Sequence, residues 1–149
     1  LEGAEYVWGD EFTPGGKPMC NNWQGEFPWQ NLLTDGYEWT APVGAFAPNG
    51  YGLYEMAGNV WEWTTDWYEE HGKIEQACCT LQNPRGGEAE HSYDPRTPNL
   101  RIPRKVMKGG SYLCALNYCR RYRPAARMAQ PIDTAIGHLG FRCIVRASV

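Results

Sequence analysis

Turn-forming residues interrupt this chain so often that it has little room for long helices or strands. Its 149 residues include 17 glycines and 11 prolines, and both residue types break helical periodicity. Seven tryptophans and nine tyrosines add large buried areas at irregular spacing. We therefore predict an α+β fold with low regular secondary structure, built mostly from short strands and ordered loops.

Local patterns predict where the few regular elements lie. Residues 6–47 are turn-rich and predict short strands and ordered loops. Residues 53–56 favour a short helix, and residues 60–67 a strand. Further strands are expected over residues 105–112, which enter a Gly109-Gly110 turn, over the arginine-rich residues 118–128, and over residues 140–145 as a buried terminal strand. The segment between the first two strands, residues 69–104, has little apolar periodicity and predicts a surface excursion.

Length and charge narrow the class of protein. A chain of this length forms one domain at most. Its formal net charge of −3 gives no indication of a nucleic-acid or membrane partner, and no apolar run approaches the ~18 residues that span a bilayer. The first residue is Leu1 rather than methionine, so a signal peptide upstream stays open. We expect a soluble protein, cytoplasmic if bacterial and in the secretory pathway if such a signal exists.

Six cysteines leave the redox compartment undecided, because their spacing does not resemble a dense disulfide scaffold. The chain has no Cys-x-x-Cys motif, which disfavours structural zinc. Cys114 and Cys119 can converge on one soft ion if the backbone bends between them, and two thiolates suit Cu(I). The same two residues can equally form a disulfide or serve as small buried hydrophobic residues.

Three motifs occur in a specific order along the chain. The first is Pro-Asn-Gly-Tyr-Gly-Leu-Tyr at 48–54 with Ala-Gly-Asn-Val-Trp-Glu-Trp at 57–63. The second is Lys-Gly-Gly-Ser-Tyr-Leu-Cys at 108–114, followed by Cys119 and Arg-Tyr-Arg at 121–123. The third is Leu-Gly-Phe-Arg-Cys at 139–143. Together they resemble the formylglycine-generating enzymes, or sulfatase-modifying factors. The chain departs from that family at Ala115, where histidine is common, and at His138, where asparagine is common.

The resemblance implies a C-type-lectin-like fold, of which residues 1–149 form the C-terminal part of a single domain. The N-terminal part of that domain is missing from this chain, so we expect a partner segment to cover apolar surface left open. Cys143 resembles a position that pairs with an upstream cysteine outside the chain.

The resemblance also implies an activity. Members are copper-dependent oxidases that use O2 and a thiol reductant to convert a cysteine in a Cys-x-Pro-x-Arg motif of an unfolded sulfatase polypeptide into formylglycine. Cys114 and Cys119 would bind Cu(I) and form the catalytic pair. Ser111 would orient the site, Trp61 would form its wall, and Tyr118 resembles a further active-site residue.

Two calcium sites are implied in the same way, because Ca²⁺ takes carboxylate, amide and carbonyl oxygens. One would use Asn21, Asn22, Asp35 and Tyr37, and the other Glu55, Gly58, Val60 and Glu62. Glu55 has a longer side chain than expected there, and the alternative is a set of solvated turn residues. None of the histidines is proposed as a metal ligand.

Three other functions stay open. The chain can be a non-catalytic binding module on the same scaffold, since a fold does not fix an activity. It can belong to the iron-dependent, sulfoxide-forming branch of the superfamily, whose histidine ligands lie in a region absent here. The cysteine pair can also be a structural disulfide.

Overall fold

A small mixed sheet is the main regular element of the computed structural model, which describes residues 3–70 and 86–145. Its strands are β1 (Trp61–Trp67), β2 (Arg104–Lys108), β3 (Met128–Pro131) and β4 (Leu139–Gly140), in the spatial order β3-β2-β1-β4. The β1–β2 and β2–β3 pairs are antiparallel, and the β1–β4 pair is parallel. Within the described ranges the helical elements are two short 3-10 turns, η1 (Pro14–Gly16) and η2 (Ala89–His91). The predicted fold class is confirmed.

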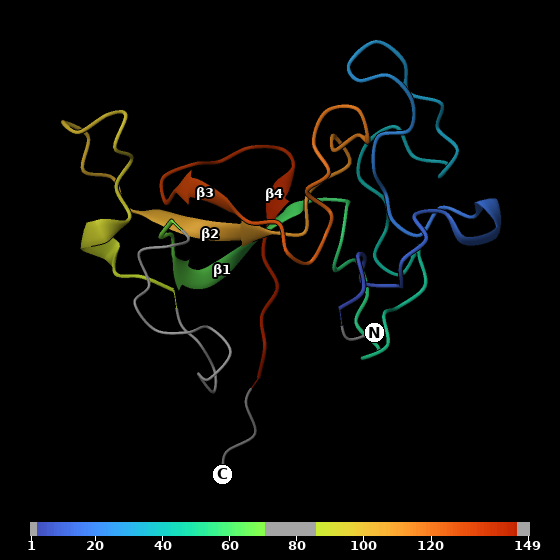
Figure 1. Ribbon diagram of the computed structural model, residues 1–149, viewed down its shortest axis with the longest axis horizontal. Coiled ribbons are helices and arrows are strands. Elements are labelled where there is room, and N and C mark those ends of the chain that lie inside the picture. The colour runs from blue at the N-terminus through green and yellow to red at the C-terminus, as the bar shows by residue number, and fades with distance from the viewer. Residues whose placement is uncertain (1–2, 71–85, 146–149) are drawn as a thin grey trace.

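The sheet and the loops form two neighbouring regions (Figure 1). The four strands lie on one side, with the segment that contains η2 at their far end. The loops of residues 3–60 lie on the other side. The connection between β2 and β3, residues 109–127, leaves the sheet, runs against these loops and returns. This connection carries both cysteines of the predicted pair, so they lie where the two regions meet.

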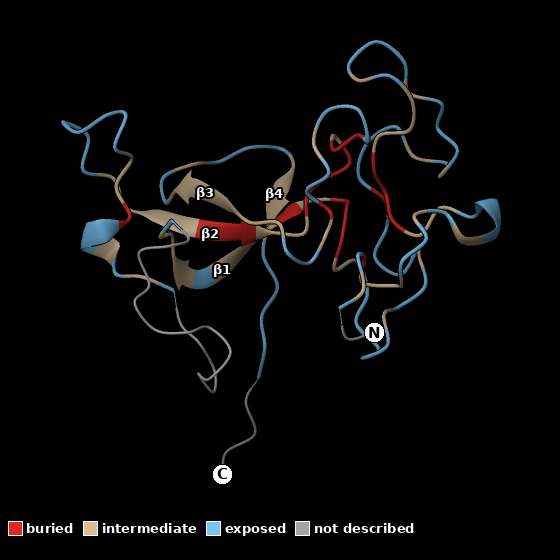
Figure 2. Cartoon of the chain, viewed as in Figure 1, coloured by how far each residue is buried: buried red, intermediate tan, exposed pale blue. Residues whose placement is uncertain are grey.

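The hydrophobic core lies along the junction between the sheet and the loops. Its buried members come from the N-terminal loops, β1, β2 and the β2–β3 connection: Tyr6, Cys20, Ala57, Trp61, Met107, Cys114 and Tyr122. Figure 2 shows the buried segments gathered along β2 and in the adjoining loops. Aromatic rings extend the core outward, with Trp8 stacked on Tyr6 at 5.2 Å and Phe12 stacked on Tyr122 at the same centroid distance. Stacked aromatic pairs add stability beyond their buried area, so they help to hold loops without regular structure.

Two of the predicted strands are confirmed. The segment expected at 60–67 forms β1, and the segment expected at 105–112 forms β2 and ends at Lys108 before the glycine turn. Both glycines of that turn have positive φ, 91° at Gly109 and 73° at Gly110. A left-handed conformation ends the strand, because it turns the backbone away from the ladder.

The predicted helix at 53–56 is wrong, because the chain there forms turns and bends. The side-chain oxygen of Asn49 accepts hydrogen bonds from the backbone N–H groups of Tyr51 and Leu53, which offers the backbone a local alternative to a helix. Glu55 has a φ of 49°, which lies outside the right-handed helical region.

Three further strand predictions are wrong, and at 118–127 the backbone forms turn hydrogen bonds instead, such as that from the Ala126 N–H to the Arg123 carbonyl at 3.0 Å. Residues 118–127 form turns, and β3 begins only at Met128. Residues 141–145 are exposed coil, because β4 ends at Gly140. Residues 6–47 contain isolated bridges, such as Tyr6 with Gly9 and Trp23 with Ala115, in place of short strands.

The predicted surface excursion at 69–104 falls partly outside the described residues, at 71–85. Residues 86–103 are mostly exposed turns around η2. Arg104 fixes their end to the sheet, since its guanidinium donates to the carbonyls of Ser92 and Tyr93 at 2.7 and 3.0 Å. No helix in the described part of the chain has the length and apolar character to cross a bilayer.

Candidate functional site

Cys114 and Cys119 come together at the junction of the sheet and the loops. Their Sγ atoms lie 3.1 Å apart, and both thiols are free. Cys114 is buried, whereas Cys119 is half-buried. Two sulfurs at this distance can share one soft metal ion or, on oxidation, form a disulfide.

Glycine and a tight turn produce this convergence. A Cβ on Gly110 would lie 2.9 Å from the backbone nitrogen of Tyr122, so the chain after β2 can approach the segment after Cys119 only with glycine here. The Cys114 N–H donates to the Ser111 carbonyl at 2.9 Å, and the Cys119 N–H donates to the Ala115 carbonyl at 2.9 Å. These two turns bring both side chains to the same side.

The pair opens into a pocket of about 300 Å³. All five predicted catalytic residues line it. The remaining lining residues come from the N-terminal loops, from β2 and β3, and from the β2–β3 and β3–β4 connections: Phe27, Met107, Leu113, Arg121, Met128, Gln130, Ile136 and His138. The pair therefore borders a pocket with room for a small molecule or a side chain, and Cys119 is its partly exposed member.

The two thiols have different electrostatic environments. A hydrogen bond with Cys119, followed by burial, raises the pKa of Cys114. The same hydrogen bond lowers the pKa of Cys119 to about 6, and the nearby positive charge of Arg121 contributes in the same direction. Cys119 is therefore the more acidic thiol of the pair, so the pair holds a nucleophilic sulfur near neutral pH before any metal binds.

Trp61, Ser111 and Tyr118 hold distinct places around the pair. Trp61 belongs to the core, and its backbone N–H donates to the His138 carbonyl at 2.8 Å. Ser111 is buried, and its hydroxyl accepts the Leu113 N–H at 3.3 Å, as in an ordinary serine turn. Tyr118 is 69% exposed and stacks on Phe27 with ring centroids 4.6 Å apart, so it forms part of the rim.

Several lining residues were missed by sequence reasoning. Phe27 precedes the pair by almost 90 positions, and no local pattern connects the two. Met107 and Met128 sit on adjacent strands in direct register, and a single sequence does not show which residues of two strands are opposed. His138 lines the pocket in place of the asparagine common in the family, and burial lowers the pKa of its imidazole, which favours the neutral form.

The first predicted calcium set lies in one place. The Asp35 carboxylate accepts the N–H groups of Asn22, at 3.3 Å, and of Tyr37, at 3.0 Å. The Oδ1 atom of Asn21 is buried and has no hydrogen-bond partner. A buried amide oxygen without a donor costs free energy unless a cation or water satisfies it. These residues fit Ca²⁺, and the side-chain amide of Asn22 reaches the Cys114 carbonyl at 3.5 Å, which connects this loop to the cysteine pair.

The second predicted set is shared with an arginine. Both carboxylate oxygens of Glu62 accept hydrogen bonds from the Arg142 guanidinium, which also donates to the Glu55 carbonyl. The Oε2 atom of Glu55 is buried without a partner, as is expected of an oxygen that can accept a cation. Nowhere in residues 3–70 and 86–145 do three carboxylate, thiol or imidazole side chains gather in a way that could hold a metal. A calcium ion at either predicted set would therefore need carbonyl and amide oxygens as ligands in addition to carboxylates.

The larger hollows elsewhere among the described residues contain no thiol, and one of about 430 Å³ lies beside Val43 and Phe141. Two hollows, of about 330 and 580 Å³, lie around Tyr93 at the far end of the sheet, and neither is lined by a thiol. Cys20 is buried and free, and burial raises its pKa. Cys143 is exposed and free, while Cys78 and Cys79 lie outside the described residues.

Comparison with known proteins identifies the family. The family model of the sulfatase-modifying factor enzyme 1-like domain matches residues 1–147. A formylglycine-generating enzyme of Thermomonospora curvata is 49% identical over 143 residues, which cover 96% of this chain and 43% of that protein. A formylglycine-generating enzyme of Mus musculus is 43% identical over 143 residues, covering 96% and 34%.

A solved structure shares the fold. Treponema denticola variable protein 1 superimposes with a TM-score of 0.61 at 24% identity, over 93% of this chain and 40% of that chain. The chain thus spans less than half the length of the curated relatives it matches. The matched model nevertheless covers nearly every residue, and the chain therefore belongs to the sulfatase-modifying factor enzyme 1-like domain family.

Proposed function

We propose that this protein is a copper-dependent formylglycine-generating oxidase, which acts on a cysteine in a Cys-x-Pro-x-Arg segment of a sulfatase. The observation that carries the proposal is the 3.1 Å separation of the Cys114 and Cys119 sulfurs at the base of an open pocket. High identity to curated formylglycine-generating enzymes supports it.

Cys114 and Cys119 fit Cu(I), because they offer two soft sulfurs, one of them ionised near neutral pH. When bound, copper would supply the one-electron chemistry that allows O2 to react with a closed-shell thiol. The two cysteines would hold the ion, and the rest of the pocket lining would be left for the substrate.

Overall, one O2 accepts four electrons. Two come from the substrate cysteine, whose Cβ loses hydrogen to give a thioaldehyde. Two come from a pair of external thiols, which leave as a disulfide. Hydrolysis of the thioaldehyde consumes one water, releases sulfide and gives the aldehyde. Reduction of O2 by four electrons gives two waters, so the reaction yields formylglycine, sulfide, a disulfide and one net water.

The other predicted residues would orient the substrate. Trp61 forms a rigid inner wall, because it is buried in the core. Ser111 has a hydroxyl beside Cys114, and it can orient a thiol through its remaining hydrogen-bonding capacity. Tyr118 and Phe27 present a stacked aromatic surface at the rim, which suits the apolar side chains of an extended peptide.

Calcium would stabilise the loops that support the pair. We propose one ion at Asn21, Asn22, Asp35 and Tyr37, and a second at Glu55, Gly58, Val60 and Glu62. The unpartnered oxygens of Asn21 and Glu55 support both sites. Since Arg142 already pairs with Glu62, we expect the second site to be the weaker one.

The proposed partners are an unfolded sulfatase segment and the remainder of the domain. Large apolar side chains stand exposed beside β4 and the 43–54 loop, among them Val43 at 87%, Tyr51 at 90% and Phe141 at 74%. Apolar surface of this extent is commonly covered by another segment. We propose that the N-terminal part of the domain packs there.

Turnover of a peptide tests the proposed function. The protein is incubated with copper, O2, a thiol and a peptide containing Cys-x-Pro-x-Arg, and mass spectrometry follows replacement of the thiol by an aldehyde. We expect conversion in the unsubstituted protein and none in Cys114→Ser or Cys119→Ser. Cys143→Ser is the matched control, because that thiol is exposed and outside the pocket. Conversion that survives the loss of either pocket cysteine would refute the proposal.

A further inference from the structure

A single side chain joins two loops at the rim of the cysteine pocket. Asn117 lies on the β2–β3 connection, and its Nδ2 atom donates to the Glu26 Oε2 atom at 2.8 Å. Its Oδ1 atom accepts the Phe27 N–H at 3.4 Å, across 90 positions of sequence. A backbone N–H can only donate and an ionised carboxylate can only accept. Asn117 suits both partners because a carboxamide carries a donor and an acceptor.

An aromatic stack lies directly beside this bridge. Phe27 stacks on Tyr118 with ring centroids 4.6 Å apart, and Trp23 meets the Phe27 ring edge-on at 5.0 Å. Phe27 and Tyr118 both line the pocket. Solvent covers most of the Tyr118 side chain, which is 69% exposed, so the position of its ring depends on the stack with Phe27.

The backbone around Asn117 forms an exposed turn between two fixed ends. At the start, the Cys114 carbonyl accepts the Trp23 N–H at 3.1 Å. At the end, the Tyr118 and Cys119 N–H groups both donate to the Ala115 carbonyl, at 3.2 and 2.9 Å. Residues 116–118 are exposed between these ends. The bridge ties this exposed stretch to the N-terminal loop, which already holds the start of the turn.

We infer that Asn117 is a positioning residue for the proposed oxidase. It joins the Glu26 side chain to the Phe27 backbone, which keeps Phe27 under Tyr118 and the aromatic rim in place for a peptide that enters the pocket. The catalytic part of this inference rests on the proposed function. The bridge does not include either sulfur, so its loss should weaken the hold on the peptide and raise KM while kcat is kept.

Reversal of the donor and the acceptor tests the bridge at nearly constant volume. Asn117→Asp replaces the donating amide by a second carboxylate, so the hydrogen bond to Glu26 is lost and two like charges face each other. Glu26→Gln keeps an accepting oxygen, so the bridge survives in neutral form. In the double variant, the carboxylate at position 117 accepts from the amide at position 26 and from the Phe27 N–H. The bridge is thereby restored in the opposite direction.

Peptide turnover gives the first measurement. We expect Asn117→Asp to raise the KM of the Cys-x-Pro-x-Arg peptide about three- to tenfold, the range that the net contribution of one hydrogen bond gives, with little change in kcat. The double variant should recover most of this loss. A KM of the double variant that is no better than that of Asn117→Asp would overturn the positioning role.

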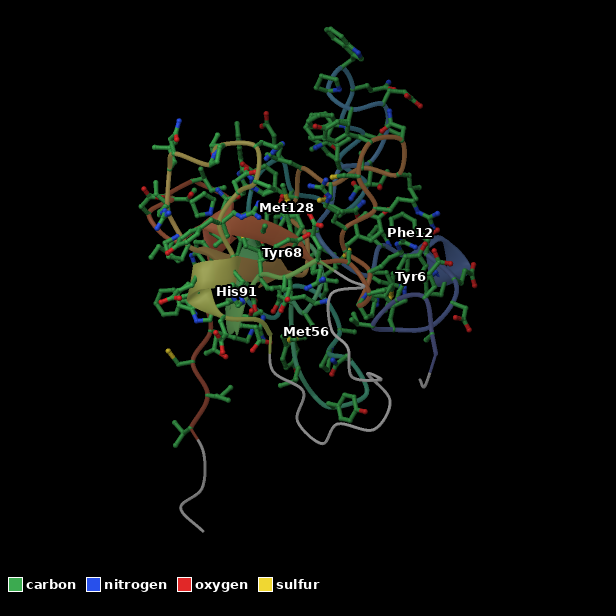
Figure 3. All side chains as sticks on the ribbon, turned by 60° about the vertical axis from the view of Figure 1, so that its left-hand side comes forward. Tyr6, Phe12, Met56, Tyr68, His91 and Met128 are labelled. Carbon is green, nitrogen blue, oxygen red and sulfur yellow. The ribbon has the colours of Figure 1, made fainter. Side chains whose placement is uncertain are left out.

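Asn99→Asp is the matched control, because it makes the same charge change at an exposed residue between η2 and β2. Figure 3 shows His91 of η2 on the opposite side of the molecule from Tyr6 and Phe12 of the N-terminal loops. We expect the control to keep the KM of the unsubstituted protein. An equal rise in KM in the control would show a general effect of charge and would contradict the inference.

Amide hydrogen exchange of the metal-free protein gives a measurement that does not depend on turnover. The Tyr118 and Cys119 N–H groups should exchange faster in Asn117→Asp than in the double variant, because local opening of the turn exposes them. Both variants carry the same residue at position 117, so the comparison isolates the bridge. Equal exchange in the two variants would overturn it. Absence of turnover in the unsubstituted protein would instead remove the proposed function, and exchange would still decide whether Asn117 holds the turn.

Discussion

Cys119 is the more reactive sulfur of the pair because its hydrogen bond with Cys114 and the charge of Arg121 lower its pKa. Its pKa is lowered to about 6, so the thiolate predominates above that pH and is lost below it. Iodoacetamide should alkylate Cys119 in the reduced, metal-free protein at a rate that rises through pH 6 and levels off near neutrality. An ordinary thiol would continue to gain reactivity up to about pH 8.5. Peptide mapping by mass spectrometry measures the rate at this residue.

The same measurement on variants identifies the cause. Cys114→Ala removes the hydrogen bond that contributes most to the lowered pKa, so the midpoint of the Cys119 profile should move to higher pH. Cys119→Ser should remove the labelling at pH 6 to 7. A Cys119 profile that Cys114→Ala leaves in place would show that the two sulfurs do not interact.

At the residue scale, the resemblance to a known family predicted the pocket residues that lie in or between its three motifs. The structure brings Cys114, Cys119, Ser111, Trp61 and Tyr118 to one pocket, and all of them belong to those segments or lie between them. Phe27 and Met128 could not be predicted, because they reach the pocket through long-range packing and strand register. Neither signal exists in a single sequence.

At the element scale, the turn after β2 decides where Cys114 lies. Gly110 has a φ of 73°, and an added Cβ would meet the Tyr122 nitrogen at 2.9 Å. Gly52 has nearly the same φ, 74°, with no atom within 4 Å of such a Cβ. Gly52→Ala should therefore cost about 1 kcal/mol of unfolding free energy for the left-handed backbone, and Gly110→Ala about 1–3 kcal/mol more for the close contact.

Urea unfolding of the two alanine variants measures this difference. The midpoint should fall further for Gly110→Ala than for Gly52→Ala, with similar slopes. Gly110→Ala should also slow alkylation of Cys119, because the turn that brings the pair together is displaced. Equal midpoints for the two variants would mean that the approach of residues 110 and 122 does not matter for stability.

The elements themselves were predictable where apolar and aromatic residues dominate. β1 and β2 followed from their sequences, since Trp61, Val106 and Met107 are buried and form the centre of the sheet. The tyrosines and arginines of residues 118–127 led to the prediction of a strand. In the structure, the Lys108 side chain donates to the carbonyls of Pro124 and Ala126 and holds the chain in turns. The contact comes from a side chain on β2, and local propensity does not reveal a contact of that kind.

At the scale of the whole molecule, stability depends on loops that have little ladder to support them. If calcium fills the site at Asn21 and Asp35, chelation with EGTA should lower the melting temperature, and added Ca²⁺ should restore it. An ion at 100 times its dissociation constant adds about 2.7 kcal/mol. Asp35→Ala should abolish most of the dependence, whereas Asp133→Ala, on the exposed β3–β4 connection, should retain it. A melting temperature that is indifferent to EGTA would exclude a stabilising calcium ion.

The overall class of fold was predictable because composition controls it. Frequent glycine and proline exclude long elements, and a small sheet surrounded by ordered loops is what remains. The junction between the N-terminal loops and the sheet was not predictable, because Tyr6 and Tyr122 meet across more than a hundred residues. That junction supports the cysteine pair, so the site depends on the least predictable feature of the fold.

The central claim is that two sulfurs on one short connection form a single copper site. The most direct test is the number of Cu(I) ions that the reduced protein takes from a competing chelator under anaerobic conditions. We predict one tightly bound Cu(I) per chain, lost in both Cys114→Ser and Cys119→Ser and retained in Cys143→Ser. Tight binding that persists without either pocket cysteine, or its absence from the unsubstituted protein, would contradict the account.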